Sequence, residues 1–161
     1  MRSREYPKDL EAWFWFYRSN VRNYPGVHFT ARSGACDVLI DCLRNWESQP
    51  LPRRTFQLPE LVPADEAKIS GGQSFTCFRK LRLVWSDEPR EIVLIQHREE
   101  TTLELVFSAK NVPALCEVIA DVKAGIGDRS IRVQSRRGGG DQLEKSSLTY
   151  WPCFGHLFPV P

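Results

Sequence analysis

The clearest pattern of apolar and polar positions lies between residues 101 and 133. Leu103, Leu105 and Phe107 alternate with more polar neighbours, as in a strand with one buried face. Apolar residues then recur at spacings of three and four, which predicts an amphipathic helix; they are Val112, Leu115, Val118, Ile119 and Val122. Ser108 or Asn111 suits the start of this helix and Gly125 its end. With a short strand over 130–133, the passage predicts strand, helix, strand.

Two earlier segments also carry helical spacing. Over 9–21, Asp9 suits an N-cap, and the apolar positions that fall on one side are Leu10, Trp13, Phe16 or Tyr17, and Val21. Over 33–46, Ser33 suits the N-cap, and the apolar face consists of Cys36, Leu39, Ile40, Leu43 and Trp46. We therefore expect two N-terminal helices.

The remaining alternation predicts strands over 75–85, 91–96 and 148–151, with a short one at 55–58 inside a long connection over 49–73. Because short turns separate the strands around 75–107, we expect an antiparallel meander there. The glycine-rich stretch 136–146 is expected to be a mobile loop. No internal repeat is evident.

These elements predict an α+β fold: two N-terminal helices and an antiparallel sheet of about five or six strands, with a further helix packed on one face before the last two strands. From residue 49 onward the order is up to four strands and then a helix. That order is similar to the unit of the Whirly and PUR-type single-strand-binding folds, a likeness of fold alone.

Composition places the chain among ordinary soluble globular proteins. It has 161 residues, 42% apolar and 26% charged, which favours a single domain over 1–161. A formal net charge of +2 does not argue for a nucleic-acid protein. The longest aromatic run, residues 13–17, is far too short for a membrane span or signal core. We expect a cytoplasmic protein whose five cysteines are reduced.

No residue set predicts catalysis, a metal or a cofactor. Asp37 and Asp41 lie one helical turn apart, yet fit a solvated helix face. The three histidines are widely separated and lack the spacing of a zinc site. Cys36 falls on an apolar helix face, which raises rather than lowers a thiol pKa. The glycine runs do not precede a helix, so neither matches a phosphate loop.

Aromatic residues near the two chain ends favour a non-catalytic module that acts through protein contacts or self-association. They exceed what one small core needs, and the candidates for protein contacts are Trp13, Trp15, Phe154 and Phe158.

The alternative is single-stranded nucleic-acid binding on a sheet surface that combines cations with stacking rings. Its candidate contacts are Lys80, Arg82, Arg129, Arg132, Arg136, Arg137, Tyr150 and Trp151. An enzyme with an unrecognised site is a third possibility.

Overall fold

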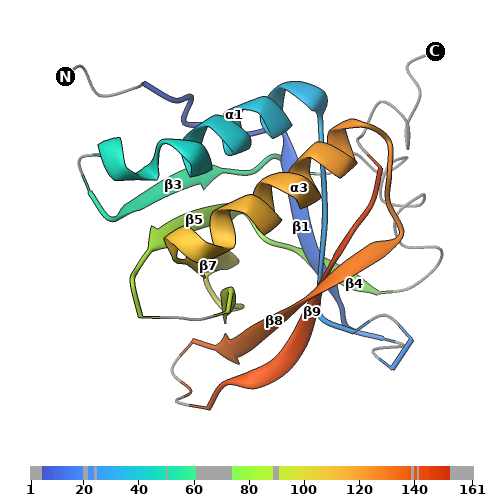
Figure 1. Cartoon of the computed structure of the whole chain (residues 1–161). Helices are drawn as coiled ribbons and strands as arrows, with labels where there is room; N and C mark the ends of the chain where they lie inside the picture. Colours follow the sequence, from blue (N-terminus) through green and yellow to red (C-terminus); the bar gives the residue numbers. More distant parts are fainter. Residues whose placement is uncertain are drawn as a thin grey trace.

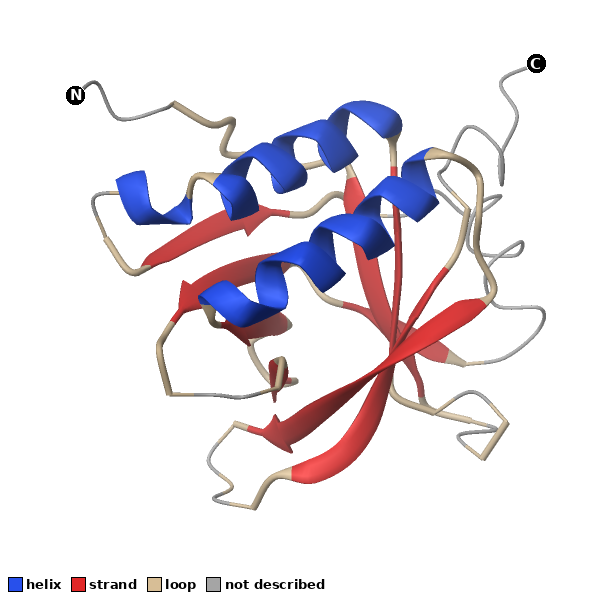
Figure 2. Cartoon of the chain, in the orientation of Figure 1, coloured by secondary structure: helices blue, strands red, loops and turns tan. Residues whose placement is uncertain are grey.

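The computed structural model describes residues 5–19, 22–23, 25–49, 51–60, 74–88, 91–138, 140 and 142–152. In this part of the chain, nine strands form one mixed sheet and two α-helices lie side by side over one of its faces (Figures 1 and 2). The helices are α1 (Ser33–Arg44) and α3 (Val112–Lys123), with short 3-10 helices at Trp46–Ser48 and Ala109–Asn111. The strands are β1 (Ala12–Tyr17), β2 (Val27–Ala31), β3 (Arg53–Gln57), β4 (Phe75–Cys77), β5 (Lys80–Trp85), β6 (Val93–His97), β7 (Thr102–Phe107), β8 (Arg129–Arg137) and β9 (Glu144–Tyr150).

The sheet curves round on itself. Its strand order is β3-β5-β7-β6-β8-β9-β2-β1-β4. Gln57, the last residue of β3, accepts a hydrogen bond from the amide of Leu10 (2.9 Å) and donates one to the carbonyl of Lys8 (2.8 Å). Both partners lie just before β1, so β3, at one end of the strand order, meets the segment that leads into β1, next to the other end. The helices cover the concave face, where Leu39 and Leu115 join inward side chains such as Leu105 in one apolar core.

The expected antiparallel sheet of five or six strands is wrong. The described sheet has nine strands and is mixed, because β5–β7, β6–β8 and β2–β9 pair in parallel. The expected antiparallel meander is wrong because β7 lies between β5 and β6. In the β6–β7 hairpin, β5 therefore pairs with β7, the second strand, and not with β6. The stretch 75–85, expected as one strand, is divided into β4 and β5, which lie far apart in the strand order.

The helix expected over 9–21 is also wrong, because this segment forms β1. Phe14 and Phe16 face the core beneath the helices, whereas Trp13, Trp15 and Tyr17 face the other side of the sheet and are buried there. A strand buried on both faces shows no alternation of apolar with polar residues. Aromatic residues fit such a pleated, covered surface well. The helical spacing at 9–21 arose because every position from 12 to 17 is apolar.

The other two predicted helices are present. The bounds of the loop expected over 136–146 are wrong, because β8 extends to Arg137 and β9 begins at Glu144. The N-cap of α1 is Arg32 and not the expected Ser33. The helix expected at 33–46 is α1, which ends at Arg44, and the helix after strand 101–107 is α3. Ser108 and Asn111 form a capping box at its entrance. Gly125 follows the helix with φ of 82°, as a left-handed terminating glycine should. The connection 49–73 contains β3, and its residues 50 and 61–73 lie outside the described residues.

The described chain contains two similar halves, which the search for repeats missed. Each half is a hairpin, a helix and a second antiparallel pair: β1-β2-α1-β3-β5 and β6-β7-α3-β8-β9. The sequence repeats too, since residues 29–33 (FTARS) match 107–111 (FSAKN), and 36–41 (CDVLID) match 116–121 (CEVIAD). The parallel pairs β5–β7 and β2–β9 join one half to the other.

Candidate anion-binding cleft

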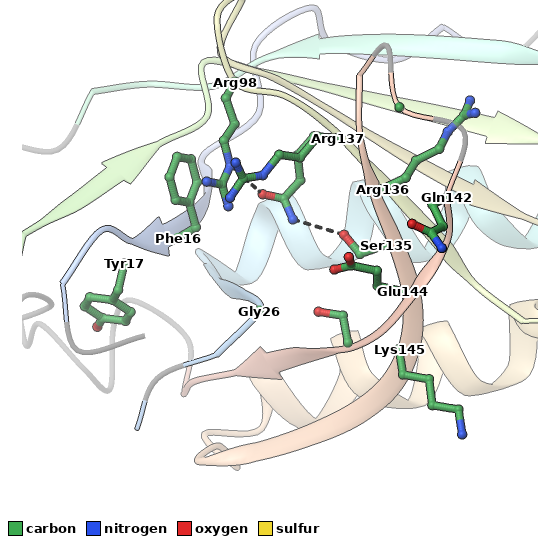
Figure 3. A pocket seen from close by; sticks show the side chains of 13 residues that line it. Phe16, Tyr17, Gly26, Arg98, Ser135, Arg136, Arg137, Gln142, Glu144 and Lys145 are labelled. Atoms are coloured by element: carbon green, nitrogen blue, oxygen red, sulfur yellow. Dashed lines mark hydrogen bonds between the residues drawn. The ribbon is translucent and has the colours of Figure 1, made fainter. Parts of the chain in front are cut away.

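A cleft of about 640 Å³ opens where β6, β8 and β1 end and β9 begins. Figure 3 shows its walls, which come from strands far apart in the sequence. Its lining residues are Phe16, Tyr17, Gly26, Gln96, Arg98, Ser135, Arg136, Arg137, Gly140, Gln142, Glu144, Lys145 and Ser146. The lining therefore combines polar and aromatic side chains, and four of its side chains carry a cationic group.

The floor of the cleft is a buried polar pair. Gln96 and Ser135 are 7% and 8% exposed, and the Gln96 amide Nε2 donates a hydrogen bond to Ser135 Oγ over 3.0 Å. Both lie on the inward-facing rows of their strands, two residues beyond the core residues Leu94 and Val133. The apolar interior thus becomes polar at this end of β6 and β8.

Arg98 is held in place from two sides. Its Nε donates a hydrogen bond to Gln96 Oε1 over 3.0 Å, and its guanidinium carbon lies 3.8 Å from the centre of the Phe16 ring. This second contact is a cation–π interaction, which favours a cation on the ring face. Figure 3 shows the guanidinium reaching across the cleft beside Phe16. These two contacts hold the guanidinium beside the Phe16 ring.

Arg137 follows Ser135 by two residues on the same inward row of β8, and Figure 3 places its side chain next to that of Arg98. The pKa of Arg98 is lowered by burial and, to a smaller extent, by the charge of Arg137. Within the described residues, no carboxylate forms an ion pair with either guanidinium. Two like charges therefore face one partly enclosed space, which favours a bound anion.

A second hollow of about 460 Å³ adjoins the first and shares Gln96, Arg98 and Arg137 with it. Its remaining wall contains His97, Gly138 and two exposed acids, Glu99 and Glu100. The cleft is therefore cationic on one side of the arginine pair and acidic on the other.

The residues predicted to contact nucleic acid are divided by the structure. Arg136 and Arg137 line the cleft, whereas Arg129 begins the same strand, about 26 Å away at about 3.3 Å per residue. By strand alternation Arg132 faces away from the core, because Ile131 and Val133 face it.

The rest of this predicted set lies elsewhere. Lys80 is exposed on β5, and Arg82 is paired at 2.6 Å with Glu104, whose carboxylate also lies 3.3 Å from His97. Tyr150 is a buried core residue whose hydroxyl donates to Asp121 over 3.2 Å. These groups do not form one stacking surface.

The aromatic residues predicted to make protein contacts lie mostly inside. Trp13 and Trp15 are 6% and 1% exposed and form a second cluster with Tyr17, on the sheet face away from the helices. His28 stacks between Trp15 and Trp151, with ring centres 5.6 Å and 6.1 Å away. Its Nδ1 accepts a hydrogen bond from Trp151 Nε1 at 3.2 Å. The other two candidates, Phe154 and Phe158, lie outside the described residues.

The other candidate groups have structural partners. Asp37 pairs with Lys123 at 2.6 Å, and Asp41 accepts a hydrogen bond from the Tyr6 hydroxyl at 2.7 Å. Cys36 and Cys116 are buried, and burial raises the pKa of the Cys116 thiol. A search of the described residues finds no group of three potential metal ligands.

Sequence reasoning missed Gln96, Arg98 and Ser135. A usable signal was present, because Gln96 and Ser135 follow the buried apolar residues Leu94 and Val133 on the inward rows of their strands. Recognising it required knowledge that β6 and β8 are neighbours, and their pairing places residues 41 positions apart side by side, as with Leu94 and Ser135.

Comparison with known proteins does not add to this description: no family model, curated protein or solved structure gives a significant match to the chain. Among the described helices, none has the length and apolar character needed to cross a membrane.

Proposed function

We propose that this protein binds a small anionic ligand in the cleft. The observation that carries the proposal is the pair of guanidinium groups of Arg98 and Arg137, which share one cleft without an acidic partner among the described residues. Burial and, to a smaller extent, the charge of Arg137 lower the pKa of Arg98, and an anion between the two groups would offset the repulsion between them. Guanidinium groups also bind carboxylates and phosphates through paired hydrogen bonds.

Size and charge support the same proposal. A volume of about 640 Å³ lies within the range of about 300–1,000 Å³ that is typical of small-molecule sites. Among the described residues that line the cleft, Arg98, Arg136, Arg137 and Lys145 are cationic and Glu144 is acidic. By strand alternation Arg136 and Lys145 lie on outward rows, so Arg98 and Arg137 supply the positive charge inside the cleft.

The two halves of the fold differ at this place. Leu58, which follows β3, is buried in the core of the first half. The pairing of β3 with β5 and of β8 with β9 makes Ser135 its counterpart in the second half. Folding does not require a polar group at this position, since the first half uses an apolar one. This difference supports a binding role for the second half.

Titration calorimetry with inorganic phosphate and with citrate at low ionic strength tests the proposal. We expect binding to at least one of these anions, and expect Arg98→Gln and Arg137→Gln each to weaken it by about tenfold or more, because a hydrogen bond to a charged group contributes about 1.5–3 kcal/mol. Arg132→Gln is the matched control: it removes the same charge from the same strand on the outward face and should leave affinity within about twofold.

Equal losses of anion affinity in Arg132→Gln and Arg137→Gln would show that anions bind through general charge attraction, which would contradict a specific site. Circular dichroism of each variant separates loss of binding from loss of fold.

Single-stranded nucleic acid is the second candidate, because Arg136 and Arg137 line an open cleft and Lys145 adds a third cation. An oligothymidine that binds more tightly than phosphate or citrate, with an affinity that falls steeply with salt, would favour it. Self-association through aromatic residues has less support, since Trp13 and Trp15 are buried.

A further inference from the structure

The charge of the cleft points to a phosphate group and not a single carboxylate. Arg98 and Arg137 present two positive charges side by side. A carboxylate carries one negative charge, which leaves one guanidinium uncompensated. A phosphate monoester carries about −1.5 to −2 at pH 7 and offers three acceptor oxygens. It can therefore neutralise both arginines at once.

The side chains that line the cleft indicate what kind of molecule carries the phosphate. Small-molecule sites are usually lined mainly by apolar side chains. Here the lining includes four further side chains that can form hydrogen bonds: Gln96, Ser135, Gln142 and Ser146. Of the two rings that also line the cleft, that of Phe16 is covered on one face by Arg98. The ligand body should then carry hydroxyl groups that these polar side chains can bind.

Ser135 is the most specific of these wall groups. Its Oγ accepts the hydrogen bond from Gln96, and no described residue accepts the Ser135 hydroxyl proton. A buried hydroxyl loses free energy when its donor is left unused. The Gln96 amide has similar spare capacity, because an amide offers two donors and two acceptor lone pairs and the described contacts use one of each. Both side chains form the floor of the cleft.

The acidic side limits how many phosphates can bind. Beyond Arg98 the adjoining hollow is bordered by Glu99 and Glu100. A second phosphate there would meet negative charge, which disfavours a chain of phosphates and favours a single one.

We infer, on the basis of the proposed anion binding, that the ligand is a phosphate monoester of a small polyhydroxylated molecule. Arg98 and Arg137 hold the phosphate, and Gln96 and Ser135 hydrogen-bond the hydroxyl groups of the body.

The test is calorimetry on the full chain with ribose 5-phosphate, inorganic phosphate, ribose and oligothymidine. We expect ribose 5-phosphate to bind at least tenfold more tightly than inorganic phosphate. Arg137→Gln should weaken both by tenfold or more. In Ser135→Ala, the affinity for ribose 5-phosphate should exceed that for inorganic phosphate by about threefold or less. The affinity for inorganic phosphate itself should stay within about twofold of the unchanged protein. Ser146→Ala, at a half-buried wall position, provides a second variant should Ser135→Ala not fold.

The outcomes distinguish failure of the inferred ligand class from failure of the proposed anion binding. If phosphate binding depends on Arg98 and Arg137 but ribose 5-phosphate gains nothing, the inferred ligand class is wrong and anion binding stands. If neither phosphate nor citrate binds, or Arg98→Gln has no effect, the proposed function itself fails. Tighter binding of oligothymidine than of ribose 5-phosphate would overturn the inference in favour of nucleic acid.

Discussion

Gly26, directly before β2, shows how one residue permits a contact between the two halves. Its φ is 75°, and a Cβ at this position would lie 2.3 Å from the carbonyl oxygen of Ser147 in β9. The next residue, Val27, is paired with Leu148 in the parallel β2–β9 ladder. Only a residue without a side chain allows the backbones to approach this closely.

Gly26→Ala should therefore destabilise the protein by about 1–2 kcal/mol from the left-handed backbone alone, with a further loss from the clash. Gly34→Ala is the opposite case, because a Cβ there meets no atom within 4 Å and alanine favours the helix by up to about 1 kcal/mol. Urea unfolding followed by tryptophan fluorescence measures both. Destabilisation of the same size in the two variants would contradict this account.

At the scale of elements, a tyrosine is bonded to each main helix at a matching position. Tyr6, before β1, donates its hydroxyl hydrogen to Asp41 of α1, and Tyr150 of β9 donates to Asp121 of α3. Asp41 and Asp121 end the repeated hexapeptides. The duplicated helices thus keep the same polar contact while their partners come from different places in the chain.

The Tyr6 contact predicts a pH dependence. Burial, and then the bond and charge of Asp41, raise the pKa of Tyr6 from 10.0 to about 12. The folded state thus holds this proton more tightly, so its contribution to stability is complete below pH 10 and is lost as pH rises from 10 to 12. Tyr6→Phe should cost about 1 kcal/mol at pH 8, the net value of a typical hydrogen bond.

Urea unfolding of both proteins at pH 8 and pH 11 measures the difference, which should shrink at the higher pH. An ultraviolet titration of tyrosinate provides the control, since Tyr6→Phe should remove one group that ionises near pH 12. A stability difference that stays constant with pH would show that Tyr6 acts by packing alone.

At the scale of the whole molecule, the halves cannot be separated without breaking the sheet. β2 pairs with β9 and β5 with β7, while α1 packs beside α3 with Lys123 bonded to Asp37 across them. Side chains of both halves enter the same apolar core. Although the architecture is duplicated, its stabilising contacts are shared.

We therefore expect a single cooperative unfolding transition. Tryptophan fluorescence and far-ultraviolet circular dichroism should give superimposable urea curves, as for a two-state domain of this size. A separate early transition in either signal would show that one half unfolds alone.

The sequence by itself determined the features that depend on neighbouring residues. The helices α1 and α3 follow from apolar spacing, and the capping box at Ser108 and the glycine at 125 follow from local backbone chemistry. The strands β6 and β7 likewise follow from short-range alternation and an apolar run.

Only the tertiary structure decided which strands meet. Sheet pairing depends on residues distant in sequence, such as Val27 and Leu148, and local periodicity does not encode it. The same reason applies to β1, whose aromatic residues form a strand because both faces are covered, and to the cleft, where Arg98 and Arg137 converge from neighbouring strands. The candidate site became visible only with the sheet order, because its polar groups stand out only once the inward rows of β6 and β8 are known.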